Sequence, residues 1–146
     1  MKLSTRARYG TRFMFDLARH YGEGPIYLGD IARRQEISEK YLGNIVRPLK
    51  NAGLIRAQRG AHGGYMLSRH PGHINLFEVV RAVEGPLSLV ECITDPEVCS
   101  HSNACIHRDV WNEVHQSIVR TLTSITLYDL VEKYRKGQKT GILYHI

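Results

Sequence analysis

The three cysteines of the chain lie close together in the sequence, at Cys92, Cys99 and Cys105. Their spacing is C-x6-C-x5-C, and the residues between them are mainly polar and include no glycine. Thiolates are soft, anionic ligands that bind zinc or the iron of iron–sulfur clusters. An odd number of cysteines argues against a closed set of disulfides. The segment therefore indicates a metal or redox site.

The spacing alone leaves two metals open. Structural zinc sites usually contain C-x2–4-C pairs, and residues 92–105 contain none. This difference favours an iron–sulfur cluster over zinc, but zinc bound by the three cysteines and one histidine stays as the alternative.

Charge is unevenly distributed along the chain. Residues 1–70 hold thirteen of the twenty Lys and Arg residues but only five of the fourteen Asp and Glu residues. A basic half on a chain with a pI of about 9.4 is typical of a DNA-binding protein, and a solvated basic face without a partner is the alternative.

The N-terminal pattern favours DNA binding. Apolar residues at helical spacing predict a helix over residues 5–21, whose buried face includes Phe13 and Tyr21. A short second helix around Leu28 and the turn "QEIS" follow. A third helix is capped by Ser38 and closed by "NAG", where Gly53 can take the left-handed conformation. Two short helices joined by a tight turn form a helix-turn-helix.

The DNA-reading residues are predicted on the third helix and on a following β-hairpin. The third helix buries its apolar stripe and leaves Lys40, Asn44 and Arg47 outside. Residues 54–69 predict two strands around the glycine-rich turn "RGAHGG", which form the wing of a winged helix and carry Arg59. Asn pairs with adenine, and Lys or Arg with guanine or phosphate.

The C-terminal half predicts a helix over residues 75–85 and a long helix over residues 108–124 with an apolar stripe from Trp111 to Ile125. We interpret the stripe as a dimerisation surface, with an internal core as the alternative. A last helix begins at Thr126. The expected fold is mainly α, divided into a winged helix-turn-helix (1–72), a cluster-binding loop with dimerisation helices (73–137) and a tail (138–146).

Several motifs in this order resemble one known family. They are "MKLSTRARYG", "YLGDIARRQEISEKYL", "RGAHGGYML", "INLFEVVRAVEG", the cysteine loop and "SITLYDLV". The chain is similar over nearly all of its length to the iron–sulfur-sensing winged-helix regulators that include IscR, NsrR and RirA (the Rrf2 family). The resemblance implies a homodimeric repressor or activator on operator DNA, and by resemblance we favour a repressor in its cluster-bound form. It would report cluster, iron, redox or nitric oxide status.

The resemblance implies Cys92, Cys99 and Cys105 as ligands of a cluster of the 2Fe–2S or 4Fe–4S type. In IscR-type proteins a histidine three positions after the third cysteine completes the site, but here that position is Arg108, which does not ligate metals. NsrR-type proteins use an acidic residue of the partner's first helix, and residues 5–8 contain none. His107 is therefore our first choice of fourth ligand, followed by His101, and then by water or a small thiol.

The N-terminus shows no apolar signal segment and the chain no membrane-length apolar run, so we expect a cytoplasmic protein with reduced thiols. The scattered histidines form no recognisable catalytic constellation, so we expect no enzyme. A regulator of the same fold that responds to a metabolite or partner protein, with structural or zinc-bound cysteines, is the alternative function.

Overall fold

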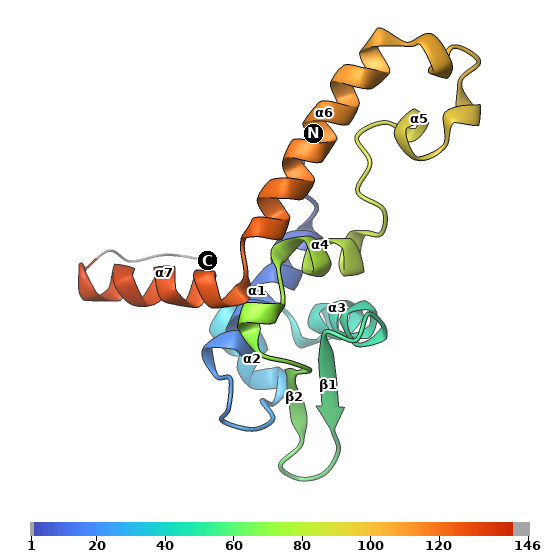
Figure 1. Cartoon of the computed structure of the whole chain (residues 1–146). Helices are drawn as coiled ribbons and strands as arrows, with labels where there is room; N and C mark the ends of the chain where they lie inside the picture. Colours follow the sequence, from blue (N-terminus) through green and yellow to red (C-terminus); the bar gives the residue numbers. More distant parts are fainter. Residues whose placement is uncertain (1, 142–146) are drawn as a thin grey trace.

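The computed structural model describes residues 2–141 and confirms a mainly helical winged-helix fold with one two-stranded antiparallel sheet (Figure 1). The elements are α1 (Thr5–Arg19), α2 (Leu28–Gln35), α3 (Glu39–Asn51), β1 (Ile55–Gln58), β2 (Gly64–Leu67), α4 (Leu76–Glu84), α5 (Glu91–Thr94), α6 (Ile106–Ser124) and α7 (Leu127–Lys139). Three short 3-10 turns, η1 (Pro71–His73), η2 (Pro96–Val98) and η3 (Ser102–Ala104), complete the description. No helix in this part of the chain has the length and apolar character of a membrane span.

Helix α3 begins and ends at the residues that the sequence indicates. The Ser38 side chain accepts a hydrogen bond of 3.1 Å from the Tyr41 N–H. At the other end, Gly53 has a φ of 71° and donates to the Lys50 carbonyl at 3.0 Å, while Leu54 donates to Leu49 at 3.1 Å. These bonds satisfy free groups at both helix ends and fix the length of α3.

The β1–β2 hairpin is confirmed, with Ile55 opposite Leu67 and Gln58 opposite Gly64. The sequence did not predict a third segment beside it: Ile26 and Tyr65 exchange backbone hydrogen bonds of 2.9 and 2.8 Å. A Cβ at Gly64 would lie 2.2 Å from the Ile26 carbonyl oxygen. Only glycine therefore allows the chain before α2 to pack against the hairpin.

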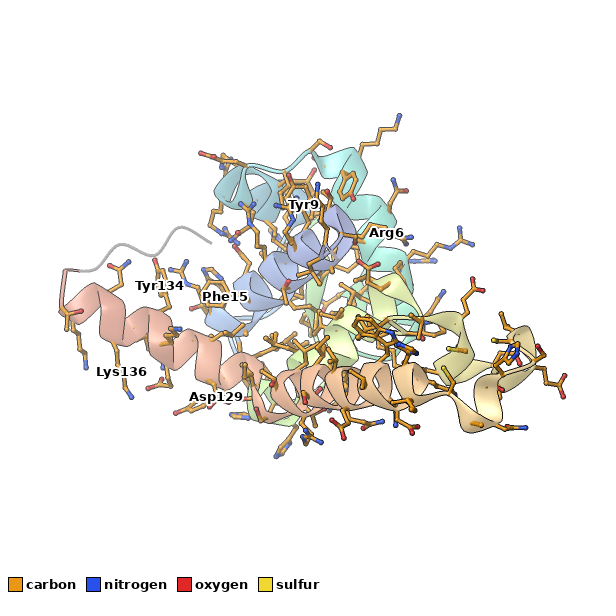
Figure 2. The ribbon with its side chains drawn as sticks, turned by 90° about the horizontal axis from the view of Figure 1, so that it is seen from above. Arg6, Tyr9, Phe15, Asp129, Tyr134 and Lys136 are labelled. Atoms are coloured by element: carbon orange, nitrogen blue, oxygen red, sulfur yellow. The ribbon has the colours of Figure 1, made fainter. Side chains whose placement is uncertain are left out.

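Helix α1 lies at the centre of the core, and α3, α4 and α7 pack against it. Figure 2 shows Phe15 of α1 beside Tyr134 of α7, and their ring centroids are 5.6 Å apart. The prediction that α1 extends to a buried Tyr21 is wrong. The helix ends at Arg19, and Tyr21 is 48% exposed because the backbone leaves helical geometry at His20.

A buried carboxylate joins α1 to α2, the first helix of the helix-turn-helix. Asp16 has no exposed surface and accepts two hydrogen bonds from Arg34, of 2.6 and 3.1 Å, and one of 3.0 Å from Gln35. These hydrogen bonds favour the charged guanidinium, so Asp16 raises the pKa of Arg34. Two side chains of α2 thus satisfy the buried charge on α1 and fix the position of α2 on α1.

Helices α4 and α7 begin at one point, although fifty residues separate their first residues. Leu76 donates to the Ile125 carbonyl and Leu127 to the Ile74 carbonyl, each at 2.9 Å, and Ile74 and Leu127 are fully buried. Each helix has a capping box at its start. We refer to this pair of hydrogen bonds as the 74–127 bridge.

Helix α6 extends away from the winged-helix body, and the cysteine segment lies at its far end (Figure 1). It starts at Ile106, two residues before the predicted start, and none of its residues is buried. Helix α7 continues to Lys139, so the predicted tail over 138–146 is helical in its first two residues. The last five residues of that tail lie outside the described part of the chain.

Candidate DNA interface and cysteine segment

The outer face of α3 carries the predicted DNA-reading residues. Leu42, Ile45 and Leu49 are buried, so the helix turns its opposite side to solvent. Lys40, Asn44 and Arg47 are exposed there, and each lies about one helical turn from the next. The sequence-based assignment of the inner and outer faces agrees with the burial of these residues, and the outer face is polar and basic.

Arg59 is exposed in the turn that links β1 to β2, beside Gly60 with a φ of 117°. The hairpin extends beyond the winged-helix body, away from α6 (Figure 1). Arg56 on β1 is a further exposed cation on the same hairpin. A side chain at this position in a wing reaches phosphates or a minor groove next to the groove that the recognition helix occupies.

The cysteine segment, residues 91–108, folds into short turns. Cys92 lies on α5, Cys99 follows η2, and Cys105 is the N-cap residue of α6. All three thiols are free; Cys92 and Cys105 are half-buried and Cys99 is exposed. The buried Ser102 hydroxyl donates to the Pro96 carbonyl at 2.6 Å and joins η3 to the start of η2.

Arg108 has a role that sequence reasoning missed. Its Nε donates to the Cys92 carbonyl at 2.8 Å and so fixes α5 against the first turn of α6. His107, one residue earlier, is exposed on the same turn, and His101 is exposed beside Ser100. A hydrogen bond from an arginine sixteen residues away has no periodic signal, so the sequence could not indicate it.

Residues 2–141 contain no group of three His, Cys, Asp or Glu side chains close enough to hold a metal ion. The structure therefore places the predicted ligands on one short segment without gathering them. As a donor set, three free thiols and neighbouring imidazoles fit an iron–sulfur cluster. Closing them around a cluster requires the turns between Cys92 and Cys105 to rearrange.

A largely apolar groove of about 450 Å³ lies between the N-terminal residues, the chain after α4, and α6. Leu3, Val80, Leu87, Ile118 and Leu122 line it. Ser4 caps α1 by accepting from the Ala7 N–H and also donates to Glu84 at the end of α4. The start of α1 and the entry to the cysteine segment thus meet beside α6.

Comparisons with known proteins agree with this architecture. The sequence profile of Rrf2, described as an iron-dependent transcriptional regulator, matches residues 3–133. The HTH-type transcriptional regulator CymR of Bacillus subtilis is 39% identical over the full length of both chains. Protein rrf2 of Nitratidesulfovibrio vulgaris is 43% identical over 90% of this chain and 87% of its own.

Solved structures show the same likeness. The structure titled T. potens IscR has a TM-score of 0.78 and 39% identity, covering 94% of this chain and 91% of that one. The structure of CymR, titled the global cysteine regulator of B. subtilis, has a TM-score of 0.76 and covers 91% of this chain and 98% of its own. These relatives are transcriptional regulators and not enzymes. The chain therefore belongs to the Rrf2 family of DNA-binding transcriptional regulators.

Proposed function

We propose that the protein is a homodimeric transcriptional regulator whose operator affinity depends on an iron–sulfur cluster held by the cysteine segment. One observation carries the proposal: the chain joins an exposed polar face on α3 to three free thiols at the far end of α6, a long helix with an exposed apolar strip. The parts that would read DNA, form the dimer and bind the cluster are thus connected through one chain.

On DNA, α3 enters the major groove and the β1–β2 hairpin contacts the adjacent backbone or minor groove. Asn44 lies between Lys40 and Arg47 along the exposed face, where an amide can make two hydrogen bonds with adenine. In a two-fold symmetric dimer, the two α3 helices read half-sites about one helical turn, roughly 34–36 Å, apart. The expected operator is therefore a pseudo-palindrome.

Asn44→Ala is expected to relax base preference at one operator position and to cost about 1–3 kcal/mol of operator binding, because the alanine makes neither hydrogen bond. Arg59→Ala is expected to weaken binding evenly, or mainly at A·T tracts. Fluorescence anisotropy on operators with single base changes separates the two patterns. Wild-type binding by both variants would show that the reading face is assigned wrongly.

The exposed side of α6 supports the dimer. Ile106, Val110, Trp111 and Val114 are 78%, 51%, 45% and 37% exposed in the single chain. An apolar strip of this kind on a long helix is unfavourable in water and marks an interaction surface. A second copy of the chain packs against it in the proposed dimer.

Val114→Lys places a charge in this strip and is expected to convert the dimer to monomer at micromolar concentration, since the buried ammonium would lack a partner. Operator affinity is expected to fall with it, by about tenfold or more, because a monomer contacts one half-site. Light scattering measures the first effect and anisotropy the second. Gln116→Lys, an exposed polar residue of α6, is the matched control; an unchanged dimer in Val114→Lys contradicts the assignment.

Cys92, Cys99 and Cys105 would hold the cluster, with His107 as first candidate for the fourth ligand. When bound, the cluster would supply a metal core that connects three points of a segment otherwise held by hydrogen bonds between its short turns. Arg108 transmits the position of Cys92 to the first turn of α6. Because α6 carries the proposed dimer surface, a shift there changes the spacing of the two α3 helices.

The test is a titration of one operator with cluster-bound and cluster-free protein at fixed salt without oxygen. The expected difference is about 5- to 150-fold, the usual range of coupling between two sites. We expect the cluster-bound form to bind more tightly and to repress. Equal affinities on every operator tried would contradict the sensor function, even if the cluster is present.

A regulator with the same fold but another signal is the second candidate. The described thiols are not gathered into a metal site, and one relative at 39% identity is titled a global cysteine regulator. Metal analysis of protein purified without oxygen distinguishes the candidates. Iron and sulfide in equal amounts support the cluster, one zinc per chain supports a structural zinc site, and neither metal supports a metabolite or partner signal.

A further inference from the structure

Gly43 lies in the exposed part of α3, between Lys40 and Arg47 along the helix. A Cβ added there would meet no heavy atom within 4 Å apart from those of its chain neighbours and its own helix backbone, and the backbone is helical with a negative φ. Alanine would therefore fit the protein without strain. Glycine is much less favourable than alanine inside a helix, because it loses more backbone freedom on folding.

Other glycines of the chain have a reason within the protein. Gly64 is contacted by the Ile26 backbone, Gly10 by the Val83 side chain at 3.2 Å, and Gly53 has a positive φ. Gly43 has neither a close neighbour nor a special backbone conformation. Neither packing nor backbone conformation accounts for Gly43, so its cause is sought first at the surface that α3 presents.

We propose that Gly43 is a specificity-determining position at which the missing side chain lets α3 lie close to the base edges of the major groove. The inference rests on the proposed placement of α3 in DNA. The neighbouring Asn44 has a short side chain, so its amide reaches a base only when the helix backbone is close. A methyl group at position 43 would need about 3.5–4 Å to the nearest DNA carbon and would move the amide out of hydrogen-bonding distance.

An alternative reason for Gly43 lies within the helix. Pro48 removes one backbone donor, and its ring meets the carbonyl of Asn44, so a glycine nearby could ease a bend of α3. The two explanations predict opposite effects on stability. If Gly43 eases a bend, alanine destabilises the protein; if it serves DNA approach, alanine stabilises the free protein and weakens the complex.

The experiment compares Gly43→Ala and Gly43→Met with wild type, using a duplex that the wild-type protein selects from a random-sequence pool. We expect Gly43→Ala to raise the melting temperature by about 2–4 °C. We expect the affinity of Gly43→Ala for the selected duplex to fall by at least about tenfold, which is the usual effect of one mismatched base pair. The longer side chain of Gly43→Met is expected to lower the affinity further. Affinity for an unrelated duplex changes less, because phosphate contacts dominate it.

Asn112→Ala is the matched control, since it also replaces a weak helix former by alanine at an exposed helical position, on α6 instead of α3. It is expected to raise the melting temperature without loss of affinity. The inference is overturned if Gly43→Ala lowers the melting temperature or binds the selected duplex as wild type does. If Asn44→Ala and Arg59→Ala also bind as wild type, the proposed placement of α3 fails with it; if they lose affinity, only the Gly43 inference fails.

Discussion

Replacing any one of Cys92, Cys99 and Cys105 by serine is expected to abolish cluster binding. A hydroxyl is a hard, weakly acidic ligand and does not substitute for a thiolate on iron. The described residues provide no further cysteine that could take its place. We expect iron and sulfide to fall to background, and the visible absorption band to disappear, in each of the three variants reconstituted without oxygen.

Two neighbouring substitutions serve as controls for the cysteine variants. Ser100→Ala changes an exposed residue of the same segment and is expected to leave iron content unchanged. His107→Ala is expected to allow assembly but to shorten the lifetime of the cluster. The three thiolates can still hold the cluster, and the imidazole of a fourth ligand adds less to its stability than a thiolate does. If a single serine variant retains full iron and sulfide, that cysteine is not a ligand. If the wild-type protein contains zinc and each serine variant has lost it, the zinc alternative holds.

Asp16→Ala is expected to lower the free energy of unfolding by about 2–4 kcal/mol. The substitution leaves the buried end of Gln35 and the Arg34 guanidinium without their partner, and removing one member of a buried ion pair is usually costly. This loss in the free energy of unfolding is at the lower end of what removal of one partner of a buried ion pair usually causes, because the Arg34 side chain is 34% exposed and water can reach it. Urea denaturation monitored by circular dichroism measures the loss.

Asp30→Ala is the matched control for the buried carboxylate. Asp30 also pairs with an arginine at 2.6 Å, but the Asp30 and Arg33 side chains are 42% and 77% exposed. Exposed pairs contribute about 0–1 kcal/mol, so this variant is expected to stay close to wild type. Equal losses in the two variants would show that burial of Asp16 contributes nothing to the stability of the helix-turn-helix.

The sequence predicts the parts of the fold that depend on local periodicity and capping. Ser38 and Gly53 mark the ends of α3, and Asn75 with Gly85 marks those of α4, because the groups that satisfy free helix ends are close in sequence. The apolar stripe predicted on α6 is divided between two surroundings: Trp111 and Val114 are exposed, whereas Ile118 and Leu122 line the groove beside α4. The exposed polar face of α3 follows directly, since the buried stripe determines what remains outside.

The features that the sequence did not predict join residues far apart in the chain. The Asp16–Arg34 pair, the pairing of Ile26 with Tyr65 and the Arg108–Cys92 contact each depend on how elements pack, and single side chains carry no periodic signal of it. The end of α1 was predicted two residues too late, because apolar spacing continues to Tyr21 after the helix has ended. The sequence does not predict how the three thiols are arranged for the same reason. Their spacing identifies candidate ligands but not whether the side chains come together around one point.

The 74–127 bridge makes residues 85–124 a topological insertion. The segment leaves the winged-helix body at the end of α4, and its return at Ile125 is hydrogen-bonded to Leu76 at the start of α4, so one short helix separates its two ends whatever it contains. Closing a longer or shorter loop between fixed ends changes the free energy only slowly with length. Segments of different size can therefore be tested in its place on one winged-helix body, and a chimaera cut at Gly85 and Ile125 would combine this body with the proposed sensor segment of another regulator.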